Sequence, residues 1–272
     1  NQPTMNPEKP EPQFCFVVCR YVTDETTNRY WNECYDCVRA LYPETEIYFI
    51  DDHSPFTPSR TQGKKPMTNA FVIPSELQRG RGELLPIYYF CKMRMARCAV
   101  LLHDSIFIQR PISKTFLSTD SYHLMWDAPH NWDPNELIVQ ILKQMKPVRK
   151  MKRVFQNKQS WNMSFGAMAI VNWKFLASVF DGNNYMDVLV ENIMSRDHRM
   201  ALERILGLIL CEKGGKTQVV NGSILEQVKG TEACHENSFQ NYQQWKINGG
   251  KAESSREFPQ GGVNMIKGFT GR

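Results

Sequence analysis

Acidic residues that could bind a nucleotide and a metal ion follow two apolar segments of the sequence. Asp51 and Asp52 come directly after the apolar segment 46–50. A carboxylate at the end of a buried strand can accept hydrogen bonds from the base or ribose of a nucleotide. Asp104 follows the apolar segment 98–102, and a divalent cation that bridges two phosphates prefers carboxylate oxygen. Taken singly, each aspartate could equally cap the turn that follows its strand.

An alternating series of strands and helices would bring these carboxylates to one edge of a sheet. The nearly continuous apolar run 14–22 and the segment 46–50 predict strands, and apolar residues at helical spacing over 31–41 predict a helix between them. A helix is expected at 83–97 and a further strand at 98–102. Such βαβ units build parallel sheets, and open α/β sheets bind ligands outside the carboxyl ends of their strands. The pattern therefore predicts an α/β fold with a ligand site at that edge.

The rest of the chain is less regular. The first 12 residues contain four prolines and predict an extended linker or stem remnant. A short strand is expected at 71–73, and the second half predicts strands at 122–126 and 165–171 and helices at 134–145, 173–180, 185–194 and 199–211. After Lys213 the sequence shows little periodicity beyond 221–228. We interpret residues 13–272 as a single domain.

Composition and charge exclude several classes of protein. With 42% hydrophobic and 22% charged residues among 272, the chain is typical of a soluble globular enzyme. No apolar run approaches the roughly 18 residues that cross a bilayer, although the start at Asn1 is consistent with an upstream anchor or targeting segment. The net charge is +5, and the Lys and Arg residues are scattered along the sequence, which argues against a nucleic-acid partner. The basic stretch 146–158 is interpreted as a solvated helix end or a mobile loop.

Eight cysteines are too few for a disulfide scaffold in a chain of this length. A zinc site formed by Cys15, Cys19, Cys34 and Cys37 is conceivable, but their spacing lacks a paired knuckle pattern, so buried free cysteines are the favoured interpretation.

The two acidic sites together resemble those of the GT-A glycosyltransferases, and the order of elements matches that family over residues 14–211. In this family the first βαβ unit ends in an acidic nucleotide site, and an Asp-X-Asp motif after a later strand binds the metal ion. The chain is most similar to viral and algal-type members. Its motif, Leu102-His103-Asp104, keeps only the final aspartate. The resemblance implies a GT-A-like fold, with a mostly parallel central sheet flanked by helices, and Mn²⁺ or Mg²⁺ bound by Asp104.

The resemblance also implies residues on the nucleotide side. The segment Arg79-Gly80-Arg81-Gly82-Glu83 lets the backbone approach a ligand, and a helix that starts at Glu83 would direct its free N–H groups toward that ligand. The alternative is a surface turn with solvated arginines. His103 is either a further contact of the nucleotide and metal or a hydrogen-bonded structural residue. The nucleotide-binding residues expected in this way are Arg20, Asp51, Asp52, Arg81 and His103.

On the acceptor side, the resemblance implies that Trp161, Ser164 and Gly166 shape a sugar pocket; the alternative for Trp161 is a core position. Glu203 is expected to be the general base that removes the acceptor hydroxyl proton, with Asp197 in reserve. Without the family, Glu203 and Arg204 would be a surface charge pair and Asp197 a helix N-cap.

The implied function is transfer of a hexose or pentose from a nucleotide-diphosphate donor, by default a UDP-sugar, to a hydroxyl of a glycan or glycoprotein. Residues 13–110 would bind the nucleotide-sugar, and residues 111–272 would bind the acceptor and supply the base. With Glu203 as base the reaction inverts the anomeric centre; retention is the alternative if no carboxylate lies near the attacked face. The sequence is compatible with two cellular compartments. One is a Golgi-like lumen, which the sequons at Asn162 and Asn221 permit, and the other is the cytoplasm of a virus-infected cell.

Two other functions are weighed against this one. The degenerate motif is compatible with a catalytically inactive carbohydrate-binding or scaffolding domain of the same fold. A sugar-phosphate nucleotidyltransferase uses a related domain, but that class favours a glycine-rich phosphate loop directly after the first strand. Residues 20–24 contain no glycine, which argues against it.

Overall fold

A six-stranded sheet forms the centre of the protein. The computed structural model describes residues 10–227, 239–248 and 265–268, so residues 1–9 of the expected linker lie outside the described part. In spatial order the strands are β3 (Ala70–Pro74), β2 (Ile47–Asp51), β1 (Phe14–Arg20), β4 (Cys98–His103), β7 (Ala169–Asn172) and β6 (Tyr122–Leu124). The pairs among β3, β2, β1 and β4 are parallel, and β7 is antiparallel to both of its neighbours. The predicted α/β fold with a mostly parallel sheet is confirmed.

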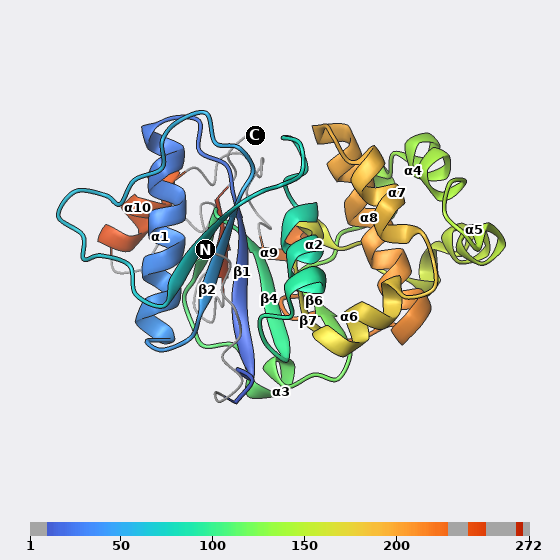
Figure 1. Ribbon diagram of the computed structural model, residues 1–272, viewed down its shortest axis with the longest axis horizontal. Coiled ribbons are helices and arrows are strands. Elements are labelled where there is room, and N and C mark those ends of the chain that lie inside the picture. The colour runs from blue at the N-terminus through green and yellow to red at the C-terminus, as the bar shows by residue number, and fades with distance from the viewer. Residues whose placement is uncertain (1–9, 228–238, 249–264, 269–272) are drawn as a thin grey trace.

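Helices cover both faces of this sheet (Figure 1). The helix α1 (Glu25–Leu41) lies on one face, and α2 (Leu84–Met93), α6 (Trp173–Phe180) and α8 (Arg196–Gly214) lie on the other. Side chains alternate along β1, so Val17 packs toward α2 whereas Val18 packs toward α1. Because β1 is covered on both faces, its sequence is apolar at almost every position.

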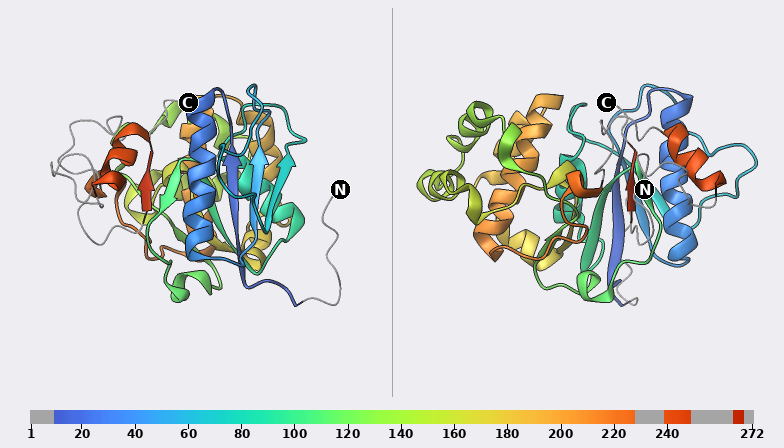
Figure 2. Two further views of the ribbon diagram at one scale, coloured as in Figure 1. Left: turned by 90° about the vertical axis from the view of Figure 1, so that its left-hand side faces the viewer. Right: turned by 180° about the vertical axis from the view of Figure 1, so that it is seen from behind.

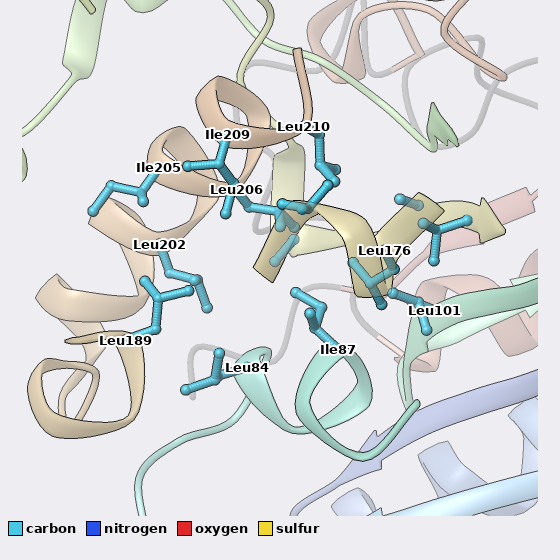
Figure 3. Close-up of a cluster of buried hydrophobic side chains, with 14 of the residues drawn as sticks. Leu84, Ile87, Leu101, Leu176, Leu189, Leu202, Ile205, Leu206, Ile209 and Leu210 are labelled. Carbon is cyan, nitrogen blue, oxygen red and sulfur yellow. The ribbon is translucent and has the colours of Figure 1, made fainter. Parts of the chain in front are cut away.

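The helix α8 is the centre of the larger hydrophobic core, where its leucines and isoleucines meet α2, α6 and β4 (Figure 3). The helices α4 (Asn135–Leu142), α5 (Val148–Gln156) and α7 (Tyr185–Asn192) pack around it. Gly207, in the middle of α8, lies against the segment that precedes β7. A Cβ atom at Gly207 would lie 2.0 Å from the carbonyl oxygen of Asn162. This close approach sets the distance between α8 and that segment.

Several predicted elements differ in their bounds, and for three of them the structure shows a local reason. α1 starts at Glu25 and not at residue 31, because the Asp24 carboxylate accepts a hydrogen bond from Thr27 N–H at 2.7 Å and caps the helix. α2 ends at Met93 because Arg94 adopts a φ of 44°. The strand predicted over 165–171 begins only at residue 169, because a 3₁₀ turn, η3 (Phe165–Ala167), precedes it, with Gly166 at φ 63°.

The basic stretch 146–158 is mostly helical. It contains α5, which buries Met151 and Phe155. The prediction of a solvated helix end or a mobile loop is therefore wrong for the apolar face of α5, because Met151 and Phe155 join the large core around α8.

The sequence pattern misses a second, two-stranded sheet. β5 (Ile106–Ile108) follows β4 closely and pairs antiparallel with β8 (Met265–Lys267). The helix α10 (Phe239–Ile247) covers this sheet beside α1, as Figure 2 shows. The rings of Phe107 and Tyr242 stack there with centroids 4.3 Å apart. A segment near the end of the chain is thereby attached next to the end of β4.

The remaining elements are short. They are α3 (Lys114–Leu117), η1 (His130–Trp132), η2 (Lys158–Ser160) and α9 (Ile224–Gln227).

None of the helices in the described ranges has the length and apolar character needed to span a bilayer. The seven cysteines in the described residues are free, and burial raises the pKa of Cys15 and Cys34 well above that of an ordinary thiol.

Replacement of Gly207 by alanine is expected to destabilise the fold. The new methyl group would collide with backbone, which cannot rotate away, so we expect a loss of about 1–3 kcal/mol in the free energy of unfolding. Urea denaturation measures this. Gly214→Ala, in the same helix, is the matched control, because its Cβ would meet the side-chain rings of Phe175 at 2.9 Å and Tyr122 at 3.3 Å and no backbone, and alanine favours helix. Equal stability of the two variants would contradict the close approach at Gly207.

Candidate active site

The carboxyl ends of β1, β2 and β4 meet at one edge of the sheet. Parallel pairing places Arg20 opposite Asp51 and Cys19 opposite His103. A cavity of about 350 Å³ lies at this edge, within the size range of small-molecule sites. Three arginines and three carboxylates contribute to its wall, together with Tyr21 and His103; the charged residues are Arg20, Arg79, Arg199, Asp52, Glu83 and Asp104. The cavity thus brings together four of the predicted site residues: Arg20, Asp52, His103 and Asp104.

Asp52 holds the glycine-rich loop in place. Its carboxylate accepts hydrogen bonds from the N–H groups of Gly80 at 3.1 Å and Gly82 at 2.9 Å. These glycines have φ values of 101° and 45°, in the left-handed region that favours glycine. The backbone of these glycines, which was expected to approach a ligand, therefore binds Asp52 in this structure. Asp52 shapes the cavity wall through the loop.

Asp51 is not among the residues that line the cavity, although Asp52 is. Its carboxylate accepts hydrogen bonds from Arg20 Nε at 2.8 Å and from the Ser54 hydroxyl at 2.8 Å. The guanidinium of Arg20 also lies 4.9 Å from the centroid of the Trp31 ring. Asp51 and Trp31 together fix Arg20 in the cavity wall, and this is the role the structure shows for Asp51.

Asp104 and His103 lie at the end of β4. Asp104 is buried, and its Oδ2 accepts a hydrogen bond from Tyr21 N–H at 3.2 Å. His103 Nε2 is 2.6 Å from the carbonyl oxygen of Gly166 and 3.8 Å from Glu83 Oε1. The imidazole thus links the cavity to the turn that contains Gly166.

The described residues near Asp104 do not form a preformed site for a divalent cation. In the described part of the chain there is no group of three His, Cys, Asp or Glu side chains that could hold a metal ion. Mg²⁺ and Mn²⁺ take six ligands, and on a nucleotide most of these come from phosphates and water, with one or two carboxylates from the protein; Asp104 is the carboxylate that the motif retains here. The ion expected from the resemblance, and the zinc site considered for the cysteines, therefore gain no support from this geometry.

Glu203, the predicted base, lies behind Gly166. Its Oε1 accepts a hydrogen bond from Gly166 N–H at 2.8 Å, and its Oε2 accepts one from Arg204 Nη1 at 2.6 Å. Burial and the neighbouring Glu83 raise the pKa of Glu203 to about 7, against the lowering effect of Arg204. Arg204 is itself buried, so this is an interior pair and not a surface charge pair. Glu203 is not among the cavity-lining residues, and Gly166 connects it to His103.

Three other predicted residues lie away from the cavity. Asp197 is in the first turn of α8, where Ser195 is the N-cap, and it lines a separate depression beside α4. Trp161 is 1% exposed and packs against His130, so its ring presents no face to a sugar. Ser164 is fully buried, and its hydroxyl lies 3.3 Å from the carbonyl oxygen of Met168. The core alternative for Trp161 fits this structure, and Ser164 is likewise a core residue.

Arg81 is a buried cation beside the glycines of the cavity wall. It is 6% exposed, and its Nε and Nη1 have no hydrogen-bond partner among the described residues. Burial of a guanidinium without partners is costly, so an anion that reaches it would be bound favourably. The predicted contact between Arg81 and phosphate stays a prediction.

The wall also contains residues that were not predicted as site residues, among them Tyr21, Glu83 and Arg199. Tyr21 directly follows the first strand, so the strand-end rule that found Asp52 and Asp104 could have found it too. For Glu83 the sequence predicts only the start of a helix, and no site role. Arg199 comes from α8, where it pairs with Glu83 Oε2 at 2.9 Å and donates to the carbonyl of Gly80 at 3.1 Å. No local sequence signal identifies such a long-range contact.

Comparisons with known proteins give only remote likenesses. Neither a protein-family model nor a curated protein sequence matches the chain. Among solved structures, the galactosyltransferase LgtC in complex with donor and acceptor sugar analogues is 10% identical, with 93% of this chain and 86% of that chain covered and a TM-score of 0.44. An active-site mutant of LgtC gives 11% identity, the same coverage and a TM-score of 0.40.

A third solved structure, residues 1–349 of TarS from S. aureus, is 18% identical, but only 35% of this chain and 28% of that chain are covered, with a TM-score of 0.29. At these identities and scores the comparisons carry no argument about the function of this chain. The function must be argued from the site.

Removal of the Asp52 carboxylate is expected to loosen the glycine-rich loop. Asp52→Ala would leave two buried N–H groups without acceptors, so we expect a loss of about 1–3 kcal/mol in stability and faster amide exchange at Gly80 and Gly82. Urea denaturation and hydrogen–deuterium exchange measure the two effects. Asp120→Ala is the control, because that carboxylate is 92% exposed and forms a surface pair with Arg97. Unchanged exchange at the two glycines would contradict the role of Asp52.

Proposed function

We propose that this protein is a glycosyltransferase that binds a nucleotide-diphosphate sugar in the cavity at the ends of β1, β2 and β4. The observation that carries the proposal is the composition of this cavity. It combines an aromatic ring, Tyr21, with arginines and with acidic residues at strand ends. Open α/β sheets bind nucleotides at this edge. The resemblance of the acidic sites to those of GT-A glycosyltransferases supports the same function.

The parts of the donor match different parts of the cavity. The Tyr21 ring provides a flat face for a nucleobase, and Asp52 and Asp104 offer carboxylate oxygens to ribose or sugar hydroxyls. Arg79 and Arg199 in the wall, and the buried Arg81 beside it, provide positive charge for the diphosphate. A UDP-sugar is the proposed donor by resemblance, and a hydroxyl of a glycan or glycoprotein is the proposed acceptor.

The proposed chemistry is direct displacement at the anomeric carbon. The acceptor oxygen forms a bond to that carbon, the bond to the diphosphate oxygen breaks, and its electron pair leaves with the nucleoside diphosphate. Glu203 takes the proton of the acceptor hydroxyl, and its pKa of about 7 suits a base that works near neutral pH. Attack from the face opposite the leaving group inverts the configuration. Glu83 is the competing base, because it lines the cavity directly, although Arg199 holds one of its oxygens.

Binding of nucleoside diphosphates tests the donor site. Isothermal titration calorimetry with UDP, GDP, CDP and ADP should show one preferred nucleotide. Tyr21→Ala should weaken its binding about 5- to 100-fold, since stacking of a base on an aromatic ring contributes roughly 1–3 kcal/mol. Tyr88→Ala removes a half-buried ring on α2 outside the cavity wall, and it should leave binding unchanged.

If no nucleoside diphosphate binds, the donor site proposed here is wrong. Binding of a glycan in that case would favour the inactive carbohydrate-binding domain.

The pH dependence of turnover tests the base. Hydrolysis or transfer of the donor should speed up as the pH rises through about 7, because only ionised Glu203 accepts a proton. Glu203→Gln should lower kcat about 100-fold or more, remove this rise and leave nucleotide affinity intact. Glu83→Gln is the matched comparison. If the rise in turnover near pH 7 is lost in Glu83→Gln and kept in Glu203→Gln, the base is Glu83.

A further inference from the structure

A lysine near the end of the chain lies beside Ser105, the residue that follows Asp104. β8 pairs with β5 so that Lys267 is opposite Ile106, and the N–H of Gly268 donates to the carbonyl of Ser105 at 2.8 Å. The Lys267 ammonium donates hydrogen bonds to the Ser105 hydroxyl and, at 3.0 Å, to the carbonyl of Gly268. Lys267 is 9% exposed. A buried positive charge is thus fixed one residue away from the predicted metal ligand.

The charge of Lys267 lowers the pKa of carboxyl groups on two other elements. Burial raises the pKa of Glu83 and of Glu203, and the nearby Lys267 acts against this rise in both. Glu83 stands at the start of α2 and Glu203 is in α8. The ammonium therefore lies next to Ser105 and near enough to Glu83 and Glu203 to affect both; Lys267 itself is not among the residues that line the cavity, although Asp104 and Glu83 are.

The charge balance of the cavity wall leaves room for a further cation in addition to Arg79, Arg199 and the buried Arg81. The three arginines of the wall are matched by its three carboxylates, and two of the arginines are already paired, Arg20 with Asp51 and Arg199 with Glu83. A diphosphate brings at least two negative charges into such a site. Without a further cation its approach to Asp104 and Glu83 would be repulsive.

We propose that Lys267 supplies the positive charge that a divalent cation would otherwise supply, so that this protein binds the diphosphate of its nucleotide without a metal ion. A dication at Asp104 would lie close to the ammonium and be repelled by it. The described residues also lack a group of three metal ligands. This inference rests on the proposed function, because the diphosphate belongs to the proposed donor.

Lys267 would act on the leaving group. When the bond between the anomeric carbon and the diphosphate oxygen breaks, the electron pair stays on that oxygen. The ammonium stabilises this charge by hydrogen bonding and remains protonated, while the acceptor proton goes to the base. The step needs no additional reactant. A buried cation that is already oriented by Ser105 and Gly268 requires little rearrangement to do this.

Calorimetric titration with UDP, in EDTA and in excess Mn²⁺, tests the inference on the full chain; where the nucleotide panel identifies another diphosphate, that nucleotide replaces UDP. The wild-type protein should bind in EDTA with an affinity within about threefold of that in Mn²⁺, since the cation adds little. Lys267→Met should weaken binding about 30-fold or more, because it leaves buried phosphate charge without its partner. Lys267→Arg should retain most of the affinity. Lys92→Met, which removes an exposed lysine paired with Glu76, should have no effect.

Binding that requires Mn²⁺ and disappears in EDTA would overturn the inference while leaving the proposed function in place. So would unchanged affinity in a folded Lys267→Met variant. If Lys267→Met does not fold, the EDTA comparison on the wild-type protein and the Lys267→Arg variant decide the matter by themselves. Absence of binding under every condition would overturn the proposed function and this inference with it.

Discussion

The parallel pairing of β1 with β2 and β4 is the constraint on which the candidate site depends. Its register aligns the ends of three strands, so Arg20, Asp52 and Asp104 reach one cavity although they are up to 84 residues apart in the sequence. The backbone hydrogen bonds from Asp52 N–H to Arg20 and from Asp104 N–H to Cys19 continue this pairing past the strands. Burial of the sheet between α1 and the α2–α8 layer makes the alignment rigid.

The first half of the fold could be predicted because its signals are local. Apolar runs predicted β1, β2 and β4, and four predicted site residues of the cavity wall lie at or directly after the carboxyl ends of these strands: Arg20, Asp52, His103 and Asp104. Local signals failed where tertiary contacts decide. Trp161 is aromatic and sits in a segment that suggests a sugar pocket, yet core packing against His130 buries it. The roles of Arg199 and Lys267 depend on contacts with residues more than 100 positions away.

Charge balance connects the site to the rest of the fold. The reduced motif leaves Asp104 without a group of metal ligands among the described residues, while the β5–β8 pairing brings a lysine to the same turn. Under the proposed function, both features favour a diphosphate whose charge is balanced by cations of the protein. Arg81, whose guanidinium has two nitrogens without described partners, is a second cation in the same region. The fold thus supplies fixed positive charge where chemistry requires it.

A crystal structure of the protein with its preferred nucleoside diphosphate, grown in the presence of Mn²⁺, tests the central claim most directly. The account predicts that the base lies against Tyr21 and that the diphosphate lies in the cavity at the ends of β1 and β4, within hydrogen-bond distance of Lys267 Nζ. A nucleotide bound elsewhere on the molecule, or an empty cavity at saturating nucleotide, would contradict the claim that this cavity is a donor site.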